Sequence, residues 1–437
     1  MPKKKTALTI EERLQQALVP AEEQPYEVPE NWVWVRLGAI AEIVTGGTPS
    51  KKQPEYYGGN FPFYKPSDLD QGRLTYDASE YLSEEGKKVS RIIPKNSTAV
   101  CCIGSIGKCG YLMCEGTTNQ QINSAIPKIN SLCLYYYLCT ENFVQNLLSM
   151  ASATTIAIVN KSKMESCAFP LPPLSEQQRI VERIEELFAK LDEAKERLQE
   201  VADSFAVRKA GILHKAFTGE LTKQWRRENG VSDESWEEKK LSEITENQDS
   251  KRIPLSKSQR DNMNRIYDYY GASGIIDKVD DYIFEGKKLL IGEDGANLVT
   301  RSKDIAFIAD GKYWVNNHAH ILDVKDTVLL MYLCHYINNM DLIPYVTGSA
   351  QPKLTQAKMN NIKIFLPTLS EQHEIVRLID DLLARERAAQ QATEQALVSI
   401  DLMKKSILAR ALRGELGTNK ASEASALELL KQVLAEN

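Results

Sequence analysis

Hydrophobic residues recur at alternating spacings of four and three along the stretch from Ile180 to Phe205. The pattern continues for more than three heptads, which favours a helix packed in a coiled coil over a helix that covers one domain core. We therefore predict a long helix with the following seam: Ile180, Ile184, Leu187, Leu191, Leu198, Val201 and Phe205.

A second stretch repeats this pattern at a constant offset of 195 residues. The segment LPPLSEQ at 171–177 matches LPTLSEQ at 366–372, and the GEL segment at 219–221 matches the one at 414–416 without a gap. A colinear match over about fifty residues indicates an internal duplication. The seam predicted for the second helix is Ile375, Ile379, Leu382, Ala389, Ala396, Ile400, Met403 and Ile407.

The two helices have predictable beginnings. Pro172 and Pro173 cannot lie inside a helix, Ser175 can act as N-cap, and Gln178 completes a capping box. A helix of ~35 residues spans ~50 Å. If the two copies pack antiparallel, they form a spacer with a pseudo-twofold relation between its ends.

The stretches between the helical copies have few helix signals and are rich in Gly, Pro, Tyr and β-branched residues. We predict an α+β fold: two strand-rich α/β domains separated by an antiparallel coiled coil of two long helices. The predicted boundaries are 1–29 for an N-terminal extension with a short helix, 30–170 for the first domain, 171–230 for the central helical spacer, 231–365 for the second domain, 366–420 for the C-terminal helical spacer and 421–437 for a tail with a short helix. The extension's helix should open with a capping box formed by Thr9 and Glu12.

The charge balance bears on possible partners. The net charge is −5; residues 30–170 carry 13 basic and 12 acidic side chains, and residues 231–365 carry 17 and 20. Since phosphate contacts supply most non-specific affinity for DNA, a DNA-binding chain with this balance needs a partner that adds positive charge. No apolar run reaches the ~18 residues of a membrane span, which favours a cytoplasmic protein. The eight cysteines show no C-x-x-C pair, so we expect buried thiols and no metal.

Several loops of the first domain carry side chains suited to DNA. Lysines can contact phosphates, Asn and Gln can pair with adenine edges, and Ser and Thr can contact several bases. The DNA-binding candidates of the first domain are Thr48, Ser50, Lys51, Lys52, Lys65, Ser67, Asn119, Gln120 and Gln121. Those of the second domain are Tyr270, Ser273, Asn297, Arg301, Asn316, Asn317, His318, Gln351 and Lys353.

Signals for catalysis are weak. The sequence has no Walker-type phosphate loop, no H-E-x-x-H and no G-x-G-x-x-G after a strand, and we predict no catalytic, cofactor or metal residue in this chain. His318 and His320 stand two residues apart and could point to one side of a strand as metal ligands, but no carboxylate partner is evident.

The arrangement resembles the specificity subunit of Type I restriction-modification systems. The most specific feature is the repeated Leu-Pro-x-Leu-Ser-Glu-Gln entry into a long helix that ends in Gly-Glu-Leu; the opening at Pro29–Trp32 and the segment Gly46–Ser50 are also similar. The resemblance implies two target recognition domains that read the halves of an asymmetric bipartite DNA site. It also implies docking of two adenine methyltransferase subunits, which bind S-adenosylmethionine, and of restriction subunits, which use ATP and Mg²⁺, in defence against phage.

Two other functions are compatible with the residues. An interaction scaffold that binds only proteins fits the acidic balance but not the Asn, Gln and Lys of the loops. A stand-alone methyltransferase would bind S-adenosylmethionine by itself. The bases read, the gap between half-sites and the presence of a nuclease partner are not predictable from the sequence.

Overall fold

The computed structural model describes residues 9–152, 157–348 and 350–436. The chain divides into two units, one formed by Met1–Leu198 with Ala396–Asn437 and the other by Gln199–Gln395. Each unit contains one strand-rich domain and half of each of two long helices, α7 (Leu174–Phe217) and α14 (Leu369–Ala411). The expected α+β fold with strand-rich domains and a long helix pair is confirmed.

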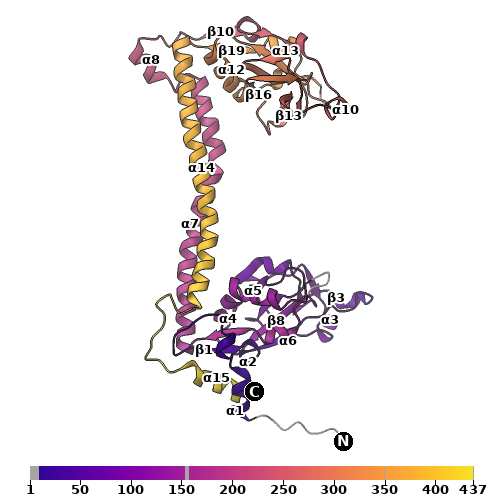
Figure 1. The fold of residues 1–437 in the computed structure, drawn as a ribbon, viewed down its shortest axis with the longest axis vertical. Coiled ribbons are helices and arrows are strands. Elements are labelled where there is room, and N and C mark those ends of the chain that lie inside the picture. Colours follow the sequence, from indigo (N-terminus) through magenta and orange to yellow (C-terminus); the bar gives the residue numbers. More distant parts are fainter. Residues whose placement is uncertain (1–8, 153–156, 349, 437) are drawn as a thin grey trace. The chain divides into compact units, whose positions relative to one another are not determined.

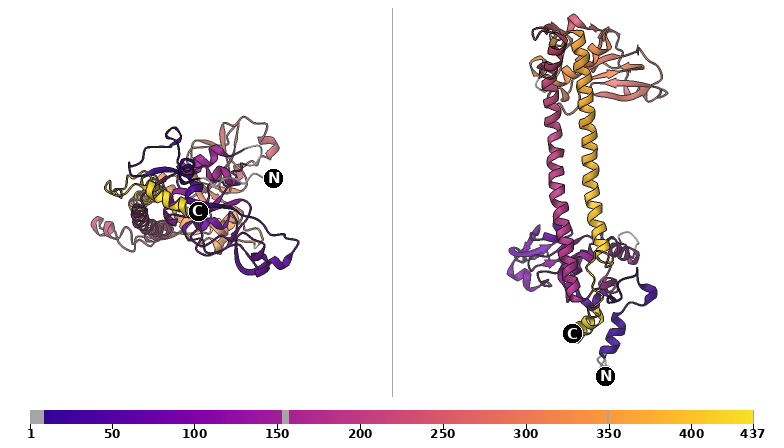
Figure 2. Two further views of the ribbon diagram at one scale, coloured as in Figure 1. Left: turned by 90° about the horizontal axis from the view of Figure 1, so that it is seen from below. Right: turned by 90° about the vertical axis from the view of Figure 1, so that its left-hand side faces the viewer.

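The two long helices have 44 and 43 residues, more than the ~35 predicted, and they end at Phe217 and Ala411, shortly before the Gly-Glu-Leu segments. Within each unit, half of α7 lies beside half of α14 (Figures 1 and 2). In the first unit Lys195 pairs with Asp401 at 3.1 Å, and Asp192 pairs with Lys404. Because a step forward along α7 corresponds to a step backward along α14, the halves run antiparallel.

The seam of the helix pair differs in part from the heptad prediction. Val201, Ala389 and Met403 are exposed, whereas Leu383 and Thr393 are buried. An α-helix has 3.6 residues per turn, so a strict seven-residue count drifts around the helix over several heptads. The predicted seam residues that are buried or half-buried are Ile180, Ile184, Leu187, Leu191, Leu198, Phe205, Ile375, Ile379, Leu382, Ala396, Ile400 and Ile407.

The prediction of Ser175 as N-cap is wrong, because α7 already begins at Leu174. The carbonyl of Pro173 accepts the first helical bonds, from the amides of Glu176 and Gln177 at 2.9 and 3.0 Å. We attribute this earlier start of the helix to Glu176 and Gln177, whose side chains are buried and need hydrogen-bond partners within the domain.

Glu176 and its counterpart Glu371 anchor each helix to its own domain. Glu176 accepts a hydrogen bond from the Trp32 indole at 2.7 Å, and Glu371 accepts one from the Trp236 indole at 3.1 Å. Glu371 also pairs with the buried Arg226 at 2.6 Å. A buried carboxylate needs such donors. The Glu of each Ser-Glu-Gln segment and the Trp near the start of each domain therefore connect the long helix to that domain.

The first domain contains three sheets. β1 (Val33–Arg36) pairs antiparallel with β9 (Ala168–Leu171). A four-stranded sheet has the order β2-β8-β5-β6, and a three-stranded sheet has the order β4-β3-β7. These strands are β2 (Ala41–Thr45), β3 (Tyr57–Tyr64), β4 (Glu80–Leu82), β5 (Thr98–Cys101), β6 (Cys109–Tyr111), β7 (Thr117–Thr118) and β8 (Ile122–Pro127). The helices are α2 (Leu37–Ile40), α3 (Glu84–Lys88), α4 (Ser131–Leu138), α5 (Glu141–Met150) and α6 (Lys161–Glu165).

The second domain repeats this topology with one additional strand, β14. β10 (Glu237–Lys240) pairs with β19 (Lys363–Leu366), and the four-stranded sheets have the orders β11-β18-β15-β16 and β13-β12-β17-β14. Their strands are β11 (Glu246–Asn247), β12 (Tyr267–Gly271), β13 (Gly274–Val279), β14 (Phe284–Glu285), β15 (Lys288–Gly292), β16 (Ala306–Ala309), β17 (Lys312–Val315) and β18 (Ala319–Asp323). The helices are α8 (Lys223–Asn229), α9 (Leu241–Ile244), α10 (Lys257–Arg260), α11 (Asn297–Thr300), α12 (Thr327–Asn339) and α13 (Gln356–Asn360). The duplication therefore includes the domains, although their sequences have diverged.

The first and last described α-helices lie together in the first unit. α1 (Ile10–Ala17) begins with the predicted capping box of Thr9 and Glu12, which is confirmed. It packs against α15 (Ala426–Ala435), where the Arg13 guanidinium donates to the Leu434 carbonyl at 3.1 Å. No helix among the described residues is long and apolar enough to span a membrane.

Candidate nucleic-acid interface

A tight turn joins β7 to β8 in the first domain and presents Gln120. The amide of Asn119 donates to the Tyr64 carbonyl at 3.1 Å, and the Asn119 side-chain oxygen accepts from the Gln121 amide at 3.0 Å. Asn119 is buried, whereas Gln120 is exposed. The short side chain of Asn suits this role because it can bond to the backbone two residues on. Asn119 therefore shapes the turn, and Gln120 points outward.

The second domain has the same turn between β17 and β18. The amide of Asn316 donates to the Tyr270 carbonyl at 3.0 Å, and its side-chain oxygen accepts from the His318 amide at 2.8 Å. Asn316 is buried, and Asn317 and His318 are exposed. The two domains thus share the positioning asparagine and differ in the pair of side chains that follows it.

The loop after β2 lies against the turn of the first domain. The Gly47 amide donates to the Thr118 carbonyl at 2.8 Å, and the Thr48 hydroxyl bonds to the side-chain oxygen of Gln120 at 2.5 Å. The structure therefore brings Thr48 and Gln120 together, although 72 residues separate them in the chain.

We expect Gly46→Ala to disrupt this loop. A Cβ at Gly46 would lie 2.1 Å from the Asn119 carbonyl oxygen, so backbone would have to move, whereas a Cβ at Gly47 would have nothing within 4 Å. Gly46→Ala should lower the free energy of unfolding by about 1–3 kcal/mol, as other overpacking changes do. Thermal unfolding measures this effect, and Gly47→Ala is the matched control. Equal melting temperatures for the two variants would contradict the close approach.

The other candidates of the first domain are not all in this cluster. Ser50, Lys51 and Lys52 are exposed in the loop after β2, and none of these lysines forms an ion pair with another described residue. Lys65 is half-buried and pairs with Glu80 at 2.8 Å. The structure therefore leaves the first pair of lysines available for phosphates and engages Lys65 in the fold.

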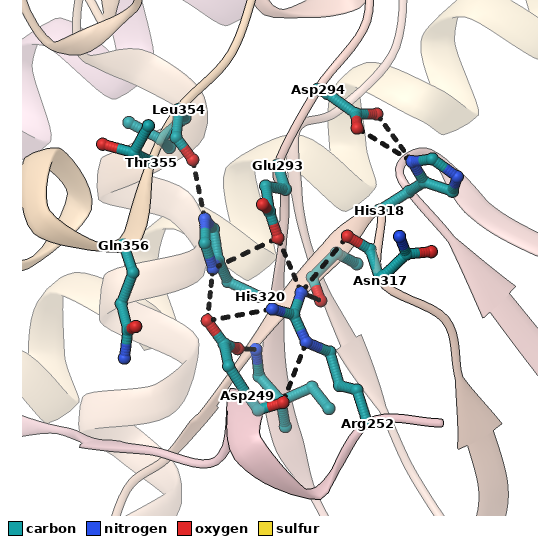
Figure 3. A network of polar contacts seen from close by, with 12 residues as sticks. Asp249, Arg252, Glu293, Asp294, Asn317, His318, His320, Leu354, Thr355 and Gln356 are labelled. Carbon is teal, nitrogen blue, oxygen red and sulfur yellow. Dashed lines mark hydrogen bonds and ion pairs between the residues drawn. The ribbon is translucent and has the colours of Figure 1, made fainter. Parts of the chain in front are cut away.

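A network of charged side chains lies beneath the turn of the second domain (Figure 3). His320 is 1% exposed; its Nδ1 lies 2.5 Å from an Asp249 oxygen and its Nε2 lies 2.7 Å from the Leu354 carbonyl oxygen. Both neighbouring oxygens can accept hydrogen bonds, so the geometry lets both ring nitrogens act as donors. Arg252 bonds to Glu293 at 2.7 Å and to the Ala319 carbonyl at 2.9 Å. The network thus ties the loop after β11 to the ends of β15 and β18.

The pKa values of the two network carboxyls are both lowered. Burial alone would raise the pKa of Asp249, but the hydrogen bond from His320 and the charge of that ring outweigh it. Burial would likewise raise the pKa of Glu293, and Arg252, His320 and Lys353 together outweigh it. Both groups are therefore held in the charged form by their cationic neighbours.

The first domain has a neutral counterpart of the Asp249–His320 pair. The Thr45 hydroxyl donates to the Asn123 side-chain oxygen at 2.7 Å, and the Asn123 amide donates to the Val159 carbonyl at 3.4 Å. Thr45 lies opposite Asn123 where β2 pairs with β8. Asp249 follows β11 and contacts β18, with which β11 pairs, so Asp249 and His320 occupy the corresponding positions in the second domain. The same position of the duplicated fold therefore holds an uncharged hydrogen-bonded pair, Thr45–Asn123, in the first domain and an ionisable pair, Asp249–His320, in the second. We call these pairs the neutral brace and the charged brace.

His318 and His320 each have a carboxylate partner, which the sequence did not reveal. The exposed His318 ring bonds through Nδ1 to Asp294 at 2.8 Å, so its Nε2 is left for other partners. The separate partners of the two rings disfavour a shared metal. Among the residues that the structure covers, no group of three His, Cys, Asp or Glu is arranged to hold a metal ion.

The remaining candidates of the second domain occupy different places. Lys353 joins the network through Glu293 at 3.1 Å. Gln351 is exposed in the loop that Thr347 and Lys353 close with two backbone bonds of 2.8 Å, and Ser273 is exposed between β12 and β13.

Three further candidates are engaged in the fold. The Tyr270 ring is buried against Tyr313. Asn297 orders its own loop by accepting from the Lys303 amide at 2.9 Å. The Arg301 guanidinium donates to the Ile337 and Met340 carbonyls at the end of α12.

Asp249, Arg252 and Glu293 were not among the residues predicted from the sequence. They belong to loops 41–72 residues away from their partners, and isolated charged residues in loops carry no signal of pairing. Aligning the two domains strand by strand would have placed Asp249 opposite His320, because the Thr45–Asn123 pair occupies that position in the first copy.

Comparisons with known proteins agree with this architecture. The family model of the Type I restriction modification DNA specificity domain matches twice, at residues 29–203 and 233–397. The specificity subunit of the type I restriction enzyme StySPI from Salmonella potsdam is 23% identical over 94% of this chain and 96% of its own length. A Haemophilus influenzae relative that is named as a type I restriction enzyme specificity subunit is 41% identical, over 33% of this chain and 37% of its own length.

A solved structure supports the fold. The HsdS subunit of Thermoanaerobacter tengcongensis has a TM-score of 0.62 at 18% identity, and the match covers 90% of this chain and all of that one. At this identity the likeness concerns the fold alone. The two matches of the family domain, however, cover most of the sequence, and one match lies almost wholly in each of the two units described above. The protein therefore belongs to the family of Type I restriction-modification DNA specificity subunits.

Proposed function

We propose that this subunit reads an asymmetric bipartite DNA site, with one half-site for each target recognition domain. The observation that carries the proposal is the duplicated turn. Asn119 and Asn316 make the same two backbone bonds, whereas the residues after them differ: the exposed Gln120 and the half-buried Gln121 in one domain, and the exposed Asn317 and His318 in the other. A shared scaffold with different exposed side chains is the arrangement that two readers of unlike sequences require.

The chemistry of these side chains suits base recognition. Gln and Asn amides carry a donor and an acceptor and can pair with the edge of adenine in the major groove. The His318 ring, held through Nδ1 by Asp294, would offer Nε2 to a base or a phosphate. Exposed Lys51 and Lys52 beside the first turn would contribute contacts with phosphates, which position the protein without reading sequence.

The partners complete the proposed function. Two methyltransferase subunits would supply S-adenosylmethionine and methylate adenine, restriction subunits would use ATP and Mg²⁺, and this chain would itself perform no chemistry. The net charge of −5 supports this division, because partner surfaces would have to provide much of the positive charge around the duplex. Acting on DNA inside the cell, the complex would be cytoplasmic.

Replacing the two residues that follow the positioning asparagine of one domain is expected to change one half-site only. We would purify the complex through a tag on this chain and select bound fragments from a random duplex library. Gln120→Ala with Gln121→Ala should relax one half of the selected site, and Asn317→Ala with His318→Ala should relax the other. Each lost base contact should reduce discrimination by about 1–3 kcal/mol.

The same selection distinguishes the competing functions. If the unmodified complex enriches no sequence and its partners remain bound after nuclease treatment, the chain is a protein scaffold. If the isolated chain binds S-adenosylmethionine in calorimetry, it is a methyltransferase itself. Relaxation of both half-sites by one pair of substitutions would contradict the assignment of one turn to each half.

A further inference from the structure

We infer that the segment Ser256–Gln259 of the second domain is a phosphate-contact site for duplex DNA, with Lys257 as the contacting residue. It is the counterpart of Ser50–Gln53 in the first domain. The inference rests on the proposed function and adds a site in a loop that the sequence analysis did not single out.

The two loops occupy the same place in the duplicated fold. One follows β2 and the other follows β11, the equivalent edge strands of the sheets β2-β8-β5-β6 and β11-β18-β15-β16. Each reaches the reading turn of its own domain. Thr48 bonds to Gln120 in the first, and Arg252 bonds to the carbonyls of Asn317 and Ala319 in the second.

A short sequence match lies inside these loops. Ser50-Lys51-Lys52-Gln53 corresponds to Ser256-Lys257-Ser258-Gln259, so both segments have the pattern Ser-Lys-x-Gln. The stretch between the strand and the Ser-Lys-x-Gln segment is longer after β11 than after β2. The two segments are therefore not found when the sequence is compared with itself at one fixed offset.

The backbone just before each Ser is held in a similar way. The Tyr57 hydroxyl donates to the Pro49 carbonyl at 2.6 Å, and the Leu255 amide donates to the Tyr269 hydroxyl at 3.0 Å. In each domain, therefore, a phenol from β3 or its equivalent β12 fixes the residue that precedes the segment.

The serine and glutamine serve the local structure and leave the lysine exposed. Ser256 caps α10, where its hydroxyl accepts from the Gln259 amide and the Gln259 side chain accepts from the Ser256 amide at 2.8 Å. In the first domain the Gln53 amide donates to the Ser50 carbonyl at 3.1 Å. Lys51 and Lys257 are both exposed as a result.

The charge of the second loop stands out against its domain. Residues 249–265 carry five basic and two acidic side chains, although the domain as a whole has an excess of acidic residues. Arg260 is occupied by Asp277 at 2.9 Å, and Arg252 by Glu293. In the portion of the chain that the structure describes, Lys251 and Lys257 form no ion pair, and both are exposed. Free ammonium groups on a loop that contacts the proposed reading turn through Arg252 fit a phosphate backbone, for which they act as point charges.

The test compares salt dependence of DNA binding in the tagged complex. Anisotropy of a labelled random 40-base-pair duplex would be measured from low to high KCl for the unmodified protein, Lys51→Ala, Lys257→Ala and Lys257→Arg. Since each phosphate contact contributes about 0.9 to the slope of log K against log salt, we expect each alanine variant to reduce the slope by about one and to weaken binding several-fold. Lys257→Arg should retain the slope.

Control lysines lie at the opposite edge of the same sheets. Lys95 precedes β5 and Lys287 precedes β15, whereas the loops with Lys51 and Lys257 follow β2 and β11, which run parallel to β5 and β15. Both control lysines are exposed, and Lys95 is the closer match because Lys287 lies 3.9 Å from Asp310. Alanine at either should leave the slope unchanged. An unchanged slope for Lys257→Ala with a reduced slope for Lys51→Ala would overturn the inference and leave DNA reading intact. A complex that shows no salt-dependent binding at all would instead overturn the proposed function.

Discussion

Insertion of seven residues into each long helix, after Leu198 in α7 and before Ala396 in α14, should abolish recognition of the unmodified protein's own target. The insertion lengthens each helix by about 10 Å. It keeps the packing faces aligned, because seven residues complete nearly two turns. If the helix pair sets the gap between half-sites, a longer pair places the second reader about three base pairs further along the duplex.

The expected readout is a changed gap between unchanged half-sites. Fragment selection would report both features at once. Three base pairs also turn the second half-site by about 100° around the duplex, so affinity for the lengthened site should remain below the original value. Insertion into one helix alone is the control; it shifts the antiparallel pairing and should lower stability. An unchanged preferred gap after the matched insertion would exclude the helix pair as the spacer.

Heptad periodicity and the constant offset of 195 residues were sufficient to predict the two long helices and the duplication, because both patterns are local or periodic. Details that depend on packing were not predictable. Met403 satisfies the heptad count but is exposed, and Thr393 interrupts it but is buried. The start at Leu174 depends on the partners of Glu176, which are distant in sequence.

The candidate site was predictable to a similar extent. Asn and Gln side chains that can pair with adenine edges drew attention to Gln120 and Asn317, and the structure places both on equivalent turns. Sequence alone could not distinguish such exposed residues from Arg301, which is engaged with backbone carbonyls of α12. Nor could it show that Asp249 meets His320, since that contact requires strand pairing over 71 residues.

His320→Asn is expected to destabilise the second recognition domain strongly, and Asp249→Thr in the same chain should restore most of the loss. The single substitution removes the hydrogen bond and the charge that His320 gives to the buried Asp249, which keeps Arg252 at 3.5 Å as a cationic neighbour; losing a hydrogen bond to a charged group costs about 1.5–3 kcal/mol. The double variant installs the neutral pair that Thr45 and Asn123 form in the first domain. Hydrogen exchange of β15 and β18 against β5 and β8 would locate the effect in one domain, and thermal unfolding would give its size.

The buried carboxylates Asp249 and Glu293 should also make the stability of the second domain sensitive to acid. The pKa values of Asp249 and Glu293 lie below their ordinary values of 3.8 and 4.5 in the folded protein, so the stabilisation is present above those values and is lost as the pH falls through the lowered ones. The Thr45–Asn123 brace contains no titrating group. Below about pH 4, β15 and β18 should therefore lose exchange protection before β5 and β8 do, and the double variant should narrow the difference. Simultaneous loss of protection in both domains, unaltered in the double variant, would show that this network does not govern acid stability.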